Sequence, residues 1–99
     1  MAPRHRAWAE INLAAFRTNL REAAAVAKQA KVWPVLKANA YGHGALKVAQ
    51  VCQQLRADRI GVGNSAEALN LRESGIATPL LVLGTVIDAE VPDLLDHSI

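Results

Sequence analysis

The sequence has little of several residue types on which large classes of protein depend. Cys52 is the only cysteine, so no disulfide can form within the chain and no cysteine-based metal site is expected. No apolar run approaches the roughly 20 residues of a membrane-spanning helix, and the apolar segment of a secretory signal is missing. We therefore expect a cytoplasmic protein without a membrane partner, in which Cys52 is a small buried hydrophobic residue.

Charge is also sparse and evenly spread. Eleven basic residues against nine acidic ones leave a net charge of +2, and the basic residues are dispersed along the chain. A nucleic-acid interface requires basic residues clustered on one surface, so no nucleic-acid partner is expected. No metal site is predicted either.

Short apolar runs alternate with amphipathic stretches from the start of the chain. Residues 1–6 form a polar tail without a structural signal. Residues 7–13 show an imperfect alternation that favours a short strand, in front of a helix-capping position at Asn12. Apolar residues at helical spacing then predict a helix over residues 14–30.

A second apolar run, residues 32–36, predicts a buried strand with Lys37 at its carboxyl end. Alternation along a strand places Trp33, Val35 and Lys37 on one face. In α/β proteins, catalytic and binding groups gather at this end of the strands. An apolar surround there would favour the free amine of Lys37, the form that attacks an aldehyde. The alternative is a lysine that extends into solvent.

The rest of the chain repeats the strand and helix pattern. Asn64 and Glu67 have the spacing of a capping box, and Gly75 is typical of a left-handed residue after a helix. Asp88 is a candidate cap for the last helix. The expected elements are a helix over 45–55, a strand over 59–63, a helix over 64–75, a strand over 80–83 and a final helix after residue 88.

This order predicts an α/β fold with a parallel sheet. Residues 7–99 correspond to the first three βα units of a (β/α)8 TIM barrel, preceded by a short strand and helix. Three units cannot close a barrel, which normally needs about 250 residues. We therefore expect this chain to be the amino-terminal part of a larger barrel protein.

One string identifies a family. Val35-Leu-Lys-Ala-Asn-Ala-Tyr-Gly-His-Gly44 closely resembles the pyridoxal-phosphate attachment signature of alanine racemases. Three further segments, 8–13, 67–76 and 79–84, resemble the opening strand, a helix and the third barrel strand of that family in the same order and spacing. The resemblance covers nearly the whole chain from Ala7 onward. It implies a pyridoxal 5′-phosphate enzyme that interconverts L-alanine and D-alanine and supplies D-alanine for peptidoglycan.

The resemblance also implies roles for matching residues. Lys37 would form the Schiff base with the cofactor and act as the base for the D-enantiomer. Tyr41 would donate its hydroxyl to the cofactor phosphate, and Leu83 would pack near the cofactor ring. His43 is expected to support the following helix rather than transfer protons. We expect the family's carboxyl-terminal β domain to lie outside these residues, and the opposite base would be a tyrosine from that domain of the partner subunit in a homodimer.

Two alternatives remain open beside the racemase. One is a related barrel protein that binds pyridoxal phosphate for carrier or homeostatic purposes. The other is a noncatalytic chain that acts as an interaction module through an exposed sheet edge. The 99 residues alone are expected to be inactive, and the sequence does not distinguish alanine from serine, or a biosynthetic from a catabolic role.

Overall fold

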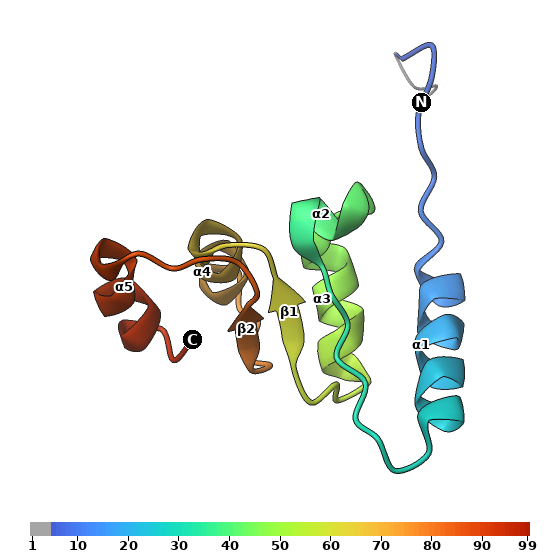
Figure 1. The fold of residues 1–99 in the computed structure, drawn as a ribbon. Coiled ribbons are helices and arrows are strands. Elements are labelled where there is room, and N and C mark those ends of the chain that lie inside the picture. Colours follow the sequence, from blue (N-terminus) through green and yellow to red (C-terminus); the bar gives the residue numbers. More distant parts are fainter. Residues whose placement is uncertain (1–4) are drawn as a thin grey trace.

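The computed structural model describes residues 5–99 and has the α/β organisation predicted from the sequence (Figure 1). Its elements are α1 (Leu13–Ala27), α2 (Lys37–Tyr41), α3 (Ala45–Gln54), β1 (Ile60–Val62), α4 (Ser65–Glu73), β2 (Leu80–Val82), the 3-10 helix η1 (Asp88–Glu90) and α5 (Val91–Asp96).

The two strands are parallel and joined by a helix. Ile60 pairs with Leu80 and Val62 with Val82, so β1, α4 and β2 form one βαβ unit. The strand predicted over residues 32–36 is reduced to a single parallel bridge between Val35 and Gly61. That prediction was too long because Pro34 has no N–H to donate to the sheet.

The bridge still aligns this segment as a third, parallel member of the sheet. The Leu36 N–H donates to the Gly61 carbonyl and the Gly61 N–H donates to the Pro34 carbonyl, each over 2.8 Å. Alternation holds as expected: Leu36 is buried at 4% exposure, whereas Trp33, Val35 and Lys37 are exposed. The segment therefore has one face toward the helices and one face away from them.

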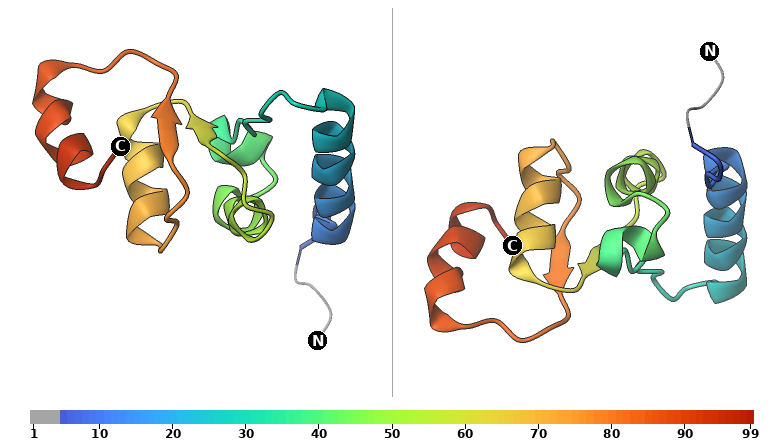
Figure 2. Two further views of the ribbon diagram at one scale, coloured as in Figure 1. Left: turned by 90° about the horizontal axis from the view of Figure 1, so that it is seen from below. Right: turned by 90° about the horizontal axis from the view of Figure 1, so that it is seen from above.

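The hydrophobic core lies between the strands and the helices that cover one face of the sheet (Figure 2). Alternate strand residues point into it, because Ile60 and Val62 are 0% exposed and Leu80 is 3% exposed. The helices contribute the remaining buried residues, which include Val48, Ala49, Cys52, Ala68 and Leu71. The opposite face of the sheet is open, and Leu83 is 52% exposed there.

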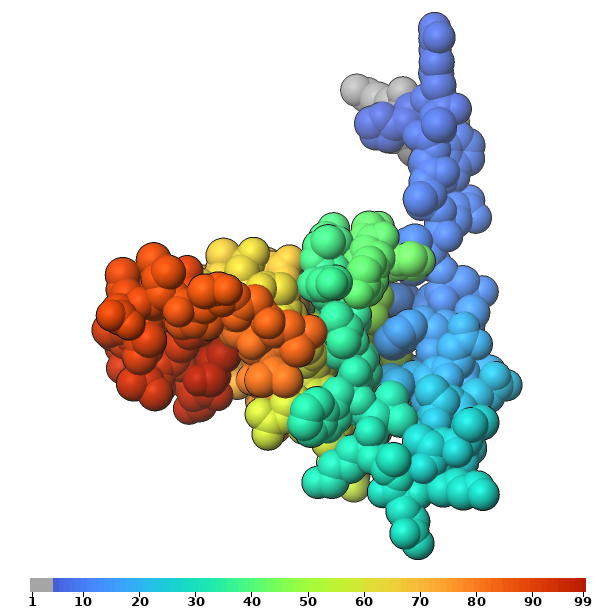
Figure 3. Space-filling model, viewed as in Figure 1, coloured from blue at the N-terminus to red at the C-terminus, as the bar shows by residue number. Residues whose placement is uncertain are grey.

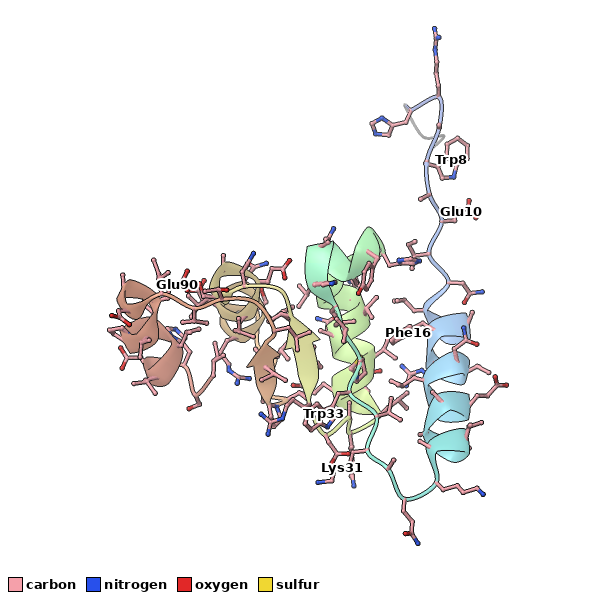
Figure 4. All side chains as sticks on the ribbon, in the orientation of Figure 1. Trp8, Glu10, Phe16, Lys31, Trp33 and Glu90 are labelled. Atoms are coloured by element: carbon pink, nitrogen blue, oxygen red, sulfur yellow. The ribbon has the colours of Figure 1, made fainter. Side chains whose placement is uncertain are left out.

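The predicted amino-terminal strand is not formed. Residues 7–12 run as an extended segment that protrudes from the body of the molecule, and none of the described residues pairs with it (Figure 3). Trp8 is 58% exposed and donates its indole N–H to the Glu10 carboxylate at 3.1 Å (Figure 4). A strand needs a neighbour to receive its backbone hydrogen bonds, and the segment has none here. Of the predicted polar tail, residues 1–4 lie outside the described residues.

Helix ends follow the local capping residues. The Asn12 side chain accepts the Ala15 N–H at 3.0 Å and starts α1 where predicted. The helix ends at Ala27 rather than residue 30 because Lys28 takes a φ of 58°. Gly75, with a φ of 96°, ends α4 as predicted, and the Ile76 N–H donates to the Leu71 carbonyl at 3.0 Å.

The predicted cap at Asp88 is wrong. Asp88 is the first residue of η1, and the residue in front of it is Ile87. The Glu90 carboxylate accepts the Ile87 N–H at 3.2 Å, so Glu90 rather than Asp88 satisfies this helix start. Asp88 and Glu90 both lie in the first turn, and the sequence alone does not show which carboxylate accepts a backbone N–H there.

The molecule is a flat slab. Its extents are 46 × 40 × 21 Å and its radius of gyration is 15.0 Å. A compact domain of this length has a radius of gyration of about 13 Å. The excess reflects the protruding segment and the sheet face that no other element covers.

Candidate functional site

Lys37 lies at the carboxyl end of the segment that pairs with β1 through the Val35 bridge, at the point where the chain leaves the sheet. It follows Leu36, the last residue of the Val35 bridge, and begins α2. A Cβ placed on Gly63 would lie 3.3 Å from the Cβ of Lys37, so the lysine stem passes directly over the residue after β1. The side chain of Lys37 is exposed, which corrects the expectation of an apolar surround. Because one sheet face is open, no apolar layer covers the amine.

The turn after Lys37 has an unusual backbone. Ala38, Asn39, Ala40 and Tyr41 have φ values of 51°, 56°, 54° and 56°, all in the left-handed region. A left-handed conformation costs roughly 1–2 kcal/mol for each residue that carries a Cβ, and asparagine tolerates it best. Four such residues in succession persist only where the surrounding structure fixes them. The sequence prediction did not include this conformation.

Hydrogen bonds fix the turn from within. The Ala40 N–H donates to the Leu36 carbonyl at 2.9 Å, and the Gly42 N–H donates to the Asn39 carbonyl at 3.1 Å. The methyl group of Ala40 is buried at 5% exposure. The turn is therefore tied both to the end of the strand segment and to the core.

The exit of the turn forms the start of α3. The Asn39 side chain accepts the Ala45 N–H at 2.7 Å, which replaces the cap that Gly44 cannot supply. Gly42 and Gly44 have φ values of 89° and 93°, which favour glycine. The His43 ring lies 2.8 Å from the Ala40 carbonyl through Nδ1, in agreement with its expected supporting role.

Tyr41 and Leu83 lie on different sides of this region. Tyr41 is 59% exposed and borders a groove of 440 Å³ that Asn12 and Phe16 also line. Figure 4 shows Phe16 projecting from α1 toward the neighbouring elements. Leu83 instead lies on the open sheet face, where a Cβ on Gly61 would be 3.1 Å from its Cδ1. The structure brings Leu83 together with Val35 over Gly61, whereas Tyr41 lies at the side of α1.

Glu67 is a site residue whose main contacts the sequence did not reveal. Asn64 caps α4 as predicted, accepting the Glu67 N–H at 2.9 Å. The Glu67 carboxylate does not return to Asn64, however. It accepts the Gly63 N–H at 2.6 Å and the Ala38 N–H at 2.9 Å. The Asn-x-x-Glu spacing signalled the residue, but only the fold shows that Ala38 is within reach.

The described part of the chain offers no alternative centre based on metal or thiol chemistry. No group of three histidine, cysteine, aspartate or glutamate side chains in residues 5–99 is placed to hold a metal ion. Cys52 is fully buried in α3, and burial raises the pKa of its thiol to about 11. It therefore behaves as the expected core residue. Over the same residues, no helix is both long and apolar enough to cross a membrane.

The sequence model of the family described as "Alanine racemase, N-terminal domain" matches residues 11–99. The alanine racemase of Methanococcus maripaludis is 42% identical over 96 residues, which cover 96% of this chain and 26% of the relative. That of Carboxydothermus hydrogenoformans is 46% identical over 92 residues, covering 93% of this chain and 25% of the relative.

Solved structures give the same result. The alanine racemase of Clostridium difficile 630 superposes with a TM-score of 0.92 at 36% identity, over 99% of this chain and 27% of that chain. The chain thus spans about a quarter of the length of the relatives it matches, and its strands and helices are those of the first part of a TIM barrel. The open sheet face and the Lys37 turn are accordingly features of a barrel segment, and the chain belongs to the alanine racemase family, of which it carries the amino-terminal domain sequence.

Proposed function

We propose that this chain carries the cofactor-binding lysine of a pyridoxal-phosphate-dependent alanine racemase. The observation that carries the proposal is the place of Lys37. It stands at the carboxyl end of a parallel segment, directly before a fixed left-handed turn, in a chain of the alanine racemase family. The proposed reaction is the interconversion of L-alanine and D-alanine, which supplies D-alanine for peptidoglycan in the cytoplasm. The relatives named above support alanine over a homeostatic role.

The residues around Lys37 fit this cofactor. The primary amine of Lys37 is accessible, as a group that bonds to an aldehyde carbon must be. Gly61 lets Val35 and Leu83 meet beside the lysine, since a Cβ at position 61 would lie 3.4 Å from Val35 Cγ2 and 3.1 Å from Leu83 Cδ1. Val35 and Leu83 offer apolar surface there for a flat ring, and the exposed hydroxyl of Tyr41 is free to donate to a phosphate oxygen. Lys37 and Leu83 would thus hold the cofactor on the open sheet face, and Tyr41 would have to reach its phosphate from the side of α1.

Bound pyridoxal phosphate would supply the electron sink that makes the α-proton of an amino acid removable. Lys37 would contribute the proton acceptor and donor on one face of the substrate carbon, that of the D-enantiomer. Its exposed amine is open to a substrate carbon on that face. The fixed turn holds the Lys37 backbone, so the orientation of the amine depends only on its own side-chain torsions.

Racemisation also requires a proton donor on the opposite face of the substrate carbon. Tyr41 is the only tyrosine in the sequence, and its proposed place is at the phosphate. The opposite base would therefore be a tyrosine outside these 99 residues, contributed by the partner subunit of a homodimer. The 99 residues alone would then bind cofactor weakly and would not racemise alanine.

The direct test is exchange of the α-proton of alanine in D2O, followed by NMR in the intact protein. Both enantiomers should lose their α-proton signal with the wild-type protein. Lys37→Ala should abolish exchange, because the attachment point and one base are removed together. Lys47→Ala is the matched control, since Lys47 is an exposed lysine of α3 that the proposed site does not include.

The outcomes separate the possibilities. Exchange that persists in Lys37→Ala would refute the role of this lysine. A wild-type protein that binds pyridoxal phosphate through Lys37 but exchanges no α-proton would favour a carrier or homeostatic protein. Serine exchanged as fast as alanine would show a broader substrate range.

A further inference from the structure

Glu67 links two successive βα units through a single carboxylate. The residue lies in the first turn of α4 (Ser65–Glu73). One oxygen, Oε1, accepts the Gly63 N–H at 2.6 Å, and the other, Oε2, accepts the Ala38 N–H at 2.9 Å. Gly63 is the residue after β1, and Ala38 is the residue after Lys37. The carboxylate therefore joins the chain leaving β1 to the chain leaving the Lys37 segment.

The space around this link is closely filled. A Cβ added to Gly63 would lie 2.9 Å from Glu67 Oε1 and 3.3 Å from the Cβ of Lys37. A side chain at position 63 would displace the Glu67 carboxylate and press on the lysine stem. Glu67 thus reaches its two N–H partners directly beneath the start of the Lys37 side chain.

The Ala38 N–H is also the point where the strained turn begins. Ala38 has a φ of 51° and is followed by three more left-handed residues. Its N–H points away from the turn's own carbonyls and toward the Glu67 carboxylate. Hydrogen bonds to a charged acceptor are roughly twice as strong as neutral ones, so this contact offsets part of the cost of the conformation.

We propose that Glu67 is a positioning residue for Lys37. Its carboxylate fixes the peptide unit between Lys37 and Ala38 and thereby sets the direction in which the lysine stem leaves the backbone. This inference rests on the proposed function of Lys37. Glu67 touches neither cofactor nor substrate, and it acts only through the Ala38 and Gly63 N–H groups.

The test is Glu67→Gln in the intact protein. A glutamine side chain offers one carbonyl oxygen and one NH2 group, so one of the two backbone N–H donors would face another donor. Two controls separate this effect from others. Glu73→Gln makes the same charge change at an exposed position at the end of α4. Asn64→Ala removes the acceptor of the Glu67 N–H and so lowers the stability of α4, but it leaves the Glu67 carboxylate and its two backbone donors unchanged.

Two readouts are needed. Pyridoxal phosphate is added, the adduct is trapped with borohydride at timed intervals, and the labelled peptides are mapped. Amide hydrogen exchange is measured at Ala38 without cofactor. Glu67→Gln should label Lys37 about tenfold or more slowly, as expected for losing one charge-assisted hydrogen bond, and should exchange the Ala38 amide faster. Glu73→Gln and Asn64→Ala should leave the labelling rate of Lys37 unchanged.

Each other result contradicts the inference in a recognisable way. Wild-type labelling at Lys37 with an equal rate in Glu67→Gln would refute positioning while the proposed function stands. Equal slowing in Asn64→Ala would assign the effect to general loss of helix stability. A wild-type protein that is not labelled at Lys37 would refute the proposed function, and the positioning role with it.

Discussion

Ala38 is held in a left-handed backbone conformation that alanine does not favour. It has a φ of 51° and its side chain is exposed, so its methyl group contributes strain and little packing. Removing that methyl group should therefore help rather than harm folding at this position. Asparagine at position 39 tolerates the same conformation without help, which fits its second task as the acceptor for the Ala45 N–H.

Ala38→Gly should raise the free energy of unfolding by up to about 1 kcal/mol, because glycine adopts positive φ without a Cβ clash. Ala23→Gly, at an exposed position inside α1, should lower it by about 1 kcal/mol. Urea unfolding of both variants measures the two effects. Destabilisation of similar size in both would show that residue 38 is not held in a left-handed conformation.

Cys52 predicts a stability change at alkaline pH. Burial raises the pKa of its thiol from the ordinary value of 9.0 to about 11. Between these values the unfolded chain loses the proton while the folded chain keeps it, so the folded state binds more protons. The contribution of Cys52 is therefore fully present below pH 9 and is lost as pH rises toward 11, by about 2–3 kcal/mol in total.

Denaturant unfolding across this pH range, for the wild type and Cys52→Ala, isolates the effect. The alanine variant pays a constant packing loss but has no thiol to titrate, so the difference between the two proteins should shrink as pH rises. A difference that does not vary with pH would mean that the thiol is accessible to solvent in the folded protein.

Tyr41 predicts an effect on cofactor affinity alone. Its ring is 59% exposed, so the loss of its hydroxyl should leave folding nearly unchanged. If the hydroxyl donates to a phosphate oxygen, Tyr41→Phe should weaken pyridoxal-phosphate binding in the intact protein by about 1.5–3 kcal/mol. An absorbance titration gives the dissociation constant. Equal affinity in the two proteins would remove Tyr41 from the proposed site.

At the scale of elements, the starts of the three longest helices each depend on one asparagine side chain. Asn12 begins α1, Asn39 begins α3 and Asn64 begins α4, each by accepting a backbone N–H through Oδ1. The residue that caps α3 comes six positions before its partner, from inside the left-handed turn. The same asparagine thus determines the turn after Lys37 and the helix that leaves it.

Asn12→Ala should lower the free energy of unfolding by about 1 kcal/mol, because one N–H in the first turn of α1 loses its acceptor. Asn19→Ala, at an exposed position inside the same helix, should be neutral or slightly stabilising, since alanine is the better helix former. Thermal unfolding of the two variants provides the comparison. A larger loss in Asn19→Ala would contradict the capping role.

The elements predicted from sequence were those whose signals are local. The caps at Asn12 and Asn64 and the left-handed Gly75 depend on neighbours within a few residues, and they are confirmed. The strands around Ile60 and Leu80 are also confirmed, and there each strand finds the other as its partner. The strand over 32–36 was predicted too long, because its apolar composition outweighed the missing N–H of Pro34. This error arises because backbone pairing, rather than composition, decides how long a strand is.

The site was harder to predict than the fold because its contacts cross units. Lys37 was identified by its neighbours in sequence. The structure places it at the end of the parallel segment, and its role in binding the cofactor stays a prediction. The Glu67 to Ala38 hydrogen bond joins residues 29 positions apart, and no local pattern indicates it. The predicted strand over 7–13 fails for a related reason: its alternation is present, but no described residue provides a partner strand.

At the scale of the whole molecule, the candidate site lies on the sheet face that the helices leave open. The helices cover one side of β1 and β2 (Figure 2). Val35, Leu83 and Lys37, at and beyond the strand ends, are exposed. The relatives that this chain matches are about four times its length. In a closed barrel that face is the interior, and the carboxyl ends of its strands surround the active site. The exposure of Lys37 in these 99 residues is consistent with that arrangement.

The central claim is that Lys37 binds the cofactor, and reductive trapping tests it most directly. The intact protein is incubated with pyridoxal phosphate, reduced with borohydride and digested, and the labelled lysine is identified by mass spectrometry. We predict a single dominant adduct on Lys37, with Lys28, Lys31 and Lys47 essentially unlabelled. An adduct on another lysine, or labelling spread over all four, would contradict the assignment.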